Sequence, residues 1–187
     1  MARADYPSHL VDAITLGDGT RVTIRPIRAE DAEIEQDFVR GLSVESRYFR
    51  FMDALNELSP RMLKRFTDID YANELALIAV IEQDGAEVEI GVARYVIAAD
   101  GGSGEFAIVV ADDWQRRGIA TALMLRLIAS ARTHGLATMY GFVLHANHGM
   151  LALMRRLGFR IEAAPGDPTL VRVVLDLAPP PQPAAAG

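Results

Sequence analysis

The chain has 187 residues, of which 50% are hydrophobic and 24% are charged, as is usual for a soluble globular domain. It contains no cysteine, which excludes disulfide bonds, thiolate catalysis and cysteine-ligated metal sites. Its net charge of -6 argues against a general nucleic-acid binder, because binding to a phosphate backbone requires a positive surface.

The ends of the sequence carry few structural signals. The first ten residues contain no apolar core of the kind found in signal peptides, and no window approaches the ~20 apolar residues that cross a bilayer. We therefore expect a cytoplasmic protein with an N-terminal extension (1–13), one folded domain (14–177) and a disordered Pro/Ala-rich tail (178–187).

The first half of the domain predicts a hairpin followed by three helices. Residues 14–16 and 21–27 flank the turn sequence Gly17-Asp18-Gly19. The spacing of apolar residues from Ala29 predicts an amphipathic helix that ends near Gly41. Ser43 and Ser59 are N-cap candidates for two further helices, the second of which begins at Pro60.

The second half alternates strands and helices. Strands are predicted over residues 75–81, 88–98, 105–110, 139–144 and 171–177, with turns at Asp84-Gly85 and at 100–104. From Gln115 the period changes, because Ile119, Leu123, Leu127 and Ala131 recur on one helical face. Gly135 occupies a C-cap position, and residues 147–157 predict a last helix.

The passage from the strand at 105–110 into the following helix is the most informative stretch. A polar loop, Gln115-Arg116-Arg117-Gly118, precedes a first helical turn of small residues. A helix N-terminus presents unpaired N–H groups and about half a positive charge, so it can bind an anion. The sequence therefore predicts an anion site, with a capped surface helix carrying two solvated arginines as the alternative.

Two sets of motifs carry a resemblance to a known family. Gln115-Arg116-Arg117-Gly118-Ile119-Ala120 resembles the Gln/Arg-x-x-Gly-x-Gly/Ala signature of the GNAT N-acetyltransferase superfamily, and Asn147 with Leu157-Gly158-Phe159 is similar to its last helix. A narrower resemblance is to the acetyltransferase domain of bacterial Pat-type protein lysine acetyltransferases. It rests on Gly17-Asp18-Gly19-Thr20, Ile24-Arg25-Pro26-Ile27, Ser46-Arg47-Tyr48-Phe49-Arg50-Phe51-Met52 and Thr67-Asp68-Ile69-Asp70-Tyr71.

The resemblance implies an α/β (α+β) GNAT fold. A central mixed, mostly antiparallel sheet is flanked by helices and splayed between the strands from Glu105 to Val110 and from Met139 to Leu144. It also implies acetyl-CoA as cosubstrate, no metal, and direct transfer of the acetyl group to an amine. The residues expected to hold acetyl-CoA are Val110, Gln115, Arg116, Arg117, Gly118, Ile119, Ala120, Thr121 and Asn147.

Glu105 is the candidate general base. Pat-type domains carry their base at the matching position, in a similar Glu-[Phe/Ile]-Ala setting. An attacking lysine has a solution pKa near 10.4, so it must lose a proton before it becomes a nucleophile. The alternative is an exposed glutamate at the start of a strand. The backbone of Val110 is expected to polarise the thioester carbonyl and to stabilise the oxyanion.

Several other residues have competing interpretations. Met154 replaces the tyrosine that serves as general acid in many GNAT enzymes, and Asn147 is either a pantetheine ligand or an ordinary N-cap. His145 and His148 lack a third metal ligand nearby, although His145 remains a second candidate base. Arg47 and Arg50 face either an acidic acceptor or solvent, and Trp114 is expected to anchor the loop by packing.

The sequence thus predicts an acetyl-CoA-dependent N-acetyltransferase acting on a protein lysine, such as the active-site lysine of an acyl-CoA synthetase. One alternative is transfer to a small amine. The other is an acetyl-CoA-sensing interaction module without catalysis. No nucleic-acid or membrane partner is expected.

Overall fold

The computed structural model describes residues 5–177, in which eight strands form one sheet. The strands are β1 (Asp12–Thr15), β2 (Arg21–Pro26), β3 (Glu74–Gln83), β4 (Ala86–Ile97), β5 (Ser103–Val110), β6 (Thr138–Leu144), β7 (Arg160–Ala163) and β8 (Leu170–Asp176). The helices are α1 (Ala32–Gly41), α2 (Val44–Phe51), α3 (Pro60–Thr67), α4 (Ile119–Thr133) and α5 (His148–Arg156). The predicted tail, residues 178–187, lies outside the described residues.

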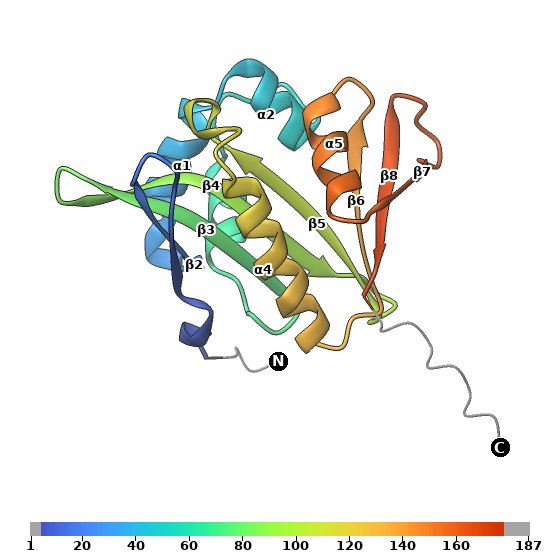
Figure 1. Ribbon diagram of the computed structural model, residues 1–187, viewed down its shortest axis with the longest axis horizontal. Helices are drawn as coiled ribbons and strands as arrows, with labels where there is room; N and C mark the ends of the chain where they lie inside the picture. Colours follow the sequence, from blue (N-terminus) through green and yellow to red (C-terminus); the bar gives the residue numbers. More distant parts are fainter. Residues whose placement is uncertain (1–4, 178–187) are drawn as a thin grey trace.

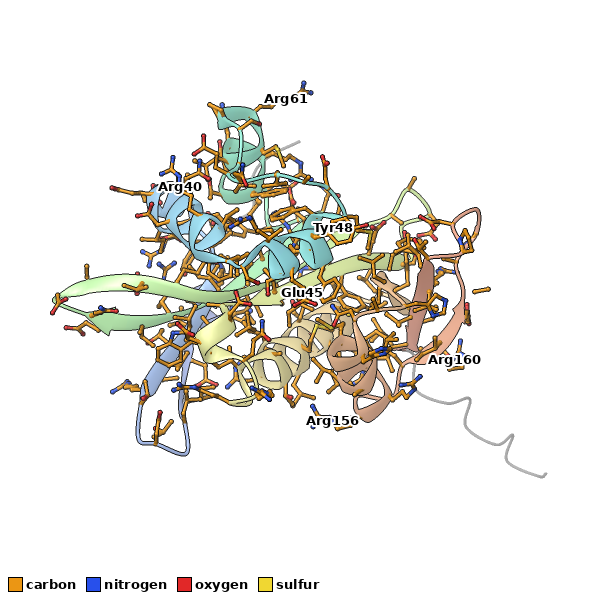
Figure 2. The ribbon with its side chains drawn as sticks, turned by 90° about the horizontal axis from the view of Figure 1, so that it is seen from above. Arg40, Glu45, Tyr48, Arg61, Arg156 and Arg160 are labelled. Carbon is orange, nitrogen blue, oxygen red and sulfur yellow. The ribbon has the colours of Figure 1, made fainter. Side chains whose placement is uncertain are left out.

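The sheet confirms the predicted fold class. Its strand order is β1-β2-β3-β4-β5-β6-β8-β7, and only the pair β5–β6 is parallel. The helices α1, α2 and α3 lie on one side of the sheet, and α4 and α5 lie on the other (Figure 2). None of the helices in residues 5–177 combines the length and the apolar character that crossing a membrane requires.

The predicted splay lies between β5 and β6. The two strands pair only at Ser103↔Thr138, Gly104↔Met139 and Glu105↔Tyr140. Beyond Glu105 the two strands diverge. In Figure 1 they lie together at the lower right and separate toward the top. Gly141 is needed at this fork, because a Cβ there would lie 2.9 Å from the Phe106 ring. Within residues 5–177, the divergence leaves the part of β5 beyond Glu105 without a neighbouring strand on this edge.

The helix ends follow the predicted signals. The side chains of Ser43 and Ser59 accept hydrogen bonds from the N–H groups of Ser46 and Met62. The predicted inner face of α4 is fully buried, and Gly135 follows the helix with φ +78°. α4 begins only at Ile119, because Arg116 and Gly118 have φ values of +61° and +90° that no α-helix accommodates.

Two features at the edges of the fold were not predicted. β7 is an edge strand with no buried residue, so its sequence lacks the apolar alternation that identifies a strand. Tyr6, within the segment separated as an extension, stacks edge-on against Tyr71 at 5.9 Å. Its hydroxyl also donates to the carbonyl of Pro26 at 3.1 Å.

A pair of glutamates lies buried between α1 and the sheet. Glu35 on α1 and Glu89 on β4 are 3% and 4% exposed, and neither carboxyl oxygen of Glu89 has a hydrogen-bond partner among the described residues. Burial, followed by the proximity of Glu35, raises the pKa of Glu89 well above its ordinary value. Glu89 therefore favours its neutral form in the folded protein.

This burial predicts how stability depends on pH. Because the pKa of Glu89 is raised in the folded state, its neutral carboxyl contributes to the free energy of unfolding in full below the unfolded-state pKa of about 4.3. This contribution is lost as pH rises through the folded-state pKa. Glu89→Gln cannot ionise, so we expect its Tm to exceed that of the wild type increasingly between pH 5 and pH 8. In a domain of this size each kcal/mol corresponds to about 2–4 °C. Glu33→Gln, an exposed change on α1, is the control, and parallel pH profiles for Glu89→Gln and wild type would contradict the prediction.

Candidate active site

A cavity of about 750 Å³ occupies the fork between β5 and β6. Residues 106–110 of β5 line one wall, and Phe142 and Val143 of β6 line the other. Side chains of α2, the start of α4 and the inner side of α5 complete the lining. Figure 2 looks onto this region, with Glu45 on α2 and Arg156 on α5 among the lining residues that it labels.

One end of the cavity is suited to an anion. The N-terminus of α4 has no side-chain cap, whereas Ser43, Ser59 and Asn147 cap α2, α3 and α5. The first N–H with a partner inside α4 is that of Ala122, which donates to the carbonyl of Gly118. The preceding N–H groups are left for another acceptor, as at any uncapped helix start. Arg116 lines the cavity beside them and forms no ion pair with a described residue.

Asp112 connects the loop before α4 to α2 through hydrogen bonds. Its carboxylate accepts hydrogen bonds from the Ser43 N–H at 2.9 Å, the Ser43 hydroxyl at 2.7 Å and the Ser46 hydroxyl at 2.8 Å. Burial acts to raise the pKa of Asp112, but these bonds outweigh it and lower the pKa. Gln115 donates from its amide to the Val110 carbonyl at 3.1 Å and to Ser46 at 3.3 Å. These hydrogen bonds therefore connect the loop directly to the cavity wall formed by α2.

The open edge of β5 presents backbone groups to the fork. Ala111 donates its N–H to the Ile90 carbonyl on β4. Because N–H directions alternate along a strand, the N–H of Val110 points away from β4, to the side from which β6 has diverged. This main-chain group is available to a ligand in the cavity, while the Val110 side chain is buried.

Glu105 lies at the last paired position before the fork. Its side chain is exposed and is not part of the cavity lining, although the next residue, Phe106, is. The Tyr140 hydroxyl donates to the Glu105 carboxylate at 3.3 Å. The carboxylate therefore lies at the closed end of the fork and is exposed, so an amine arriving from solvent could reach it.

The structure brings most of the predicted cosubstrate residues together. Those that line the cavity are Val110, Gln115, Arg116, Gly118, Ala120, Thr121 and Asn147. Two others do not line it. The Arg117 side chain pairs with Asp18 at 3.1 Å and lies over the Trp114 ring at 4.8 Å, and the Ile119 side chain is fully buried.

The structure also shows where the residues with competing interpretations lie. Asn147 caps α5 by accepting from the Met150 N–H at 3.0 Å, and it also lines the cavity, so its two interpretations are compatible. Met154 is fully buried. His145 lies at the end of β6 and His148 on the cavity wall, and residues 5–177 hold no group of three potential metal ligands.

Three site features were missed from the sequence. Asp112 lies 69 residues from its serine partners, so no local pattern indicates the contact. Arg47, which is partly exposed, donates to the carbonyls of Arg40 and Leu42 at the end of α1. Arg50 lines the cavity and lies over the Phe51 ring at 4.9 Å; burial, then Arg94, lowers its pKa to about 10.

Comparison with known proteins gives consistent matches. Residues 21–160 match the family model described as the acetyltransferase (GNAT) domain. The chain is 40% identical to acetyltransferase PA5475 of Pseudomonas aeruginosa over 157 residues, 84% of each chain. It is 32% identical to the GNAT domain of S. lividans PAT, with a TM-score of 0.83 over 92% of this chain and 99% of that one. yncA from Salmonella typhimurium, solved with its cofactor acetyl-CoA, has the same fold, with a TM-score of 0.65 over 88% of this chain and 98% of that one at 20% identity.

Proposed function

The chain belongs to the GNAT acetyltransferase family, and we propose that it transfers the acetyl group of acetyl-CoA directly to a lysine of another protein. The observation that carries this proposal is the cavity at the fork between β5 and β6. It combines an uncapped helix N-terminus with an open strand edge, and the exposed Glu105 carboxylate lies next to Phe106 of its lining. These features suit the pyrophosphate, the pantetheine arm and the attacking amine, respectively.

The proposed mechanism assigns a role to each feature. The N–H groups from Gly118 to Thr121, with Arg116, hold the pyrophosphate, and the free edge of β5 pairs with the pantetheine arm. Glu105 accepts a proton from the ammonium group, directly or through a water, and the amine attacks the thioester carbonyl. The Val110 N–H stabilises the oxyanion. Collapse breaks the C–S bond, the nitrogen releases its remaining extra proton to water as the amide forms, and coenzyme A leaves as a thiolate. The thiol pKa of ~8.5 makes a general acid unnecessary.

Two surface features support a protein as the acceptor. Glu105 is exposed at the closed end of the fork rather than enclosed in the cavity, so a lysine on a protein surface can approach it. α2, which lines the cavity through Ser46, exposes Val44 (75%) and Tyr48 (47%), and Met52, the residue that follows the helix, is 39% exposed. Exposed apolar side chains grouped on one element are typical of a contact with another protein.

The test is release of coenzyme A from acetyl-CoA with two kinds of acceptor. An acyl-CoA synthetase from the same cell is compared with polyamines, amino acids and aminoglycosides. Release with the synthetase, lost when its active-site lysine is replaced, supports the proposed acceptor. Release with small amines alone would overturn the acceptor but retain the mechanism. Binding of acetyl-CoA without release in any mixture would instead favour a sensing module.

A further inference from the structure

Tyr140 is the residue that contacts the proposed base. It lies on β6 opposite Glu105, in the last parallel pair before the strands diverge. Its hydroxyl donates to Oε2 of Glu105 at 3.3 Å. Burial, then the negative charge of Glu105, raises the pKa of Tyr140, so the hydroxyl keeps its proton and can act as the donor. No other side-chain hydrogen bond to Glu105 is recorded among residues 5–177.

The Tyr140 ring is held from two sides. Phe142, two residues further along the same face of β6, meets it edge-on at 6.0 Å, and Phe142 itself lines the cavity. Arg172 of β8 lies over the ring, with Cζ 4.6 Å from the centroid. A ring fixed on two sides loses little further freedom when its hydroxyl makes a hydrogen bond, so it can orient a mobile exposed carboxylate.

We propose that Tyr140 is a positioning residue that holds the Glu105 carboxylate, at the closed end of the fork, in the orientation needed to accept the proton of the acceptor amine. The proposal rests on the proposed function, since it requires Glu105 to be the general base. Tyr140 thus affects catalysis through Glu105 and touches neither substrate.

Tyr140→Phe tests this role, because it removes the hydroxyl and keeps the ring between Phe142 and Arg172. We expect kcat to fall about 3- to 10-fold, the effect of losing one hydrogen bond, while KM for acetyl-CoA stays the same. A purely structural role for the ring would leave kcat unchanged, because Tyr140→Phe keeps the ring.

A double-mutant cycle separates this inference from the proposed function. In the Glu105→Gln background, Tyr140→Phe should have no further effect on kcat, because the two residues act as one unit. An equal loss in both backgrounds, or an unchanged kcat in Tyr140→Phe, would overturn the role of Tyr140. Full activity of Glu105→Gln would instead remove Glu105 from the mechanism, which is a different result.

Discussion

Glu105→Gln is expected to lower kcat by about 10²- to 10⁴-fold, the range by which a positioned general base accelerates a reaction. The substitution keeps the shape of the side chain and the contact with Tyr140, but an amide cannot accept the proton of an ammonium group. Affinity for acetyl-CoA should be almost unchanged, because Glu105 lies outside the cavity lining. Steady-state release of coenzyme A and isothermal titration with acetyl-CoA measure the two quantities separately.

Two controls make this result specific. Glu82→Gln removes an exposed carboxylate from β3, away from the cavity lining, and should leave kcat unchanged. Raising the pH should partly restore turnover by Glu105→Gln, because more of the acceptor lysine is then neutral before it binds. A variant that turns over at the wild-type rate at neutral pH would exclude Glu105 as the base and direct attention to His145 at the end of β6.

The local elements of the fold could be read from the sequence because their signals are local. An N-cap serine, a Ser-Pro step at a helix start and a helical repeat of apolar residues each indicate a helix without reference to the rest of the chain. β7 could not be read, because an exposed edge strand has no buried face to impose alternation. Boundaries shifted by a few residues, as at β3, because hydrogen bonding extends past the apolar run.

The candidate site was predictable in its loop and less so in its surroundings. Arg116 and Gly118 belong to one short motif, whereas Asp112 meets Ser43 and Ser46 across a large sequence separation. The same holds for Tyr140, which meets Glu105 only because β5 and β6 pair in parallel over three positions. Such contacts depend on strand register, and register is fixed by the whole sheet rather than by either segment.

The loop and the base occupy opposite ends of β5, which separates their expected effects. In the proposed mechanism Gly118 and its neighbours bind the pyrophosphate, which is remote from the acetyl group along the cosubstrate. Glu105, near the start of the strand, instead accepts the proton of the attacking amine. Substitutions in the loop should therefore change KM for acetyl-CoA, and substitutions at Glu105 should change kcat. This division makes the loop testable independently of the chemistry.

Gly118→Val is expected to raise KM for acetyl-CoA about 10- to 100-fold, with a smaller effect on kcat. Gly118 has φ +90°, a conformation that a β-branched residue adopts only at a cost, so the loop should move and withdraw its N–H groups. Loss of one hydrogen bond to a charged phosphate corresponds to about 1.5–3 kcal/mol, which gives the expected factor.

Gly135→Val is the matched control for this variant. Gly135 follows the same helix at its other end with φ +78°, and a Cβ at either position would meet no atom within 4 Å. Both substitutions should therefore lower Tm by similar amounts, but only Gly118→Val should weaken the binding of acetyl-CoA. Acetyl-pantetheine, which lacks the pyrophosphate, should have the same KM with Gly118→Val as with the wild type. An equal rise in KM for both donors would mean that the loop shapes the cavity without binding the phosphates.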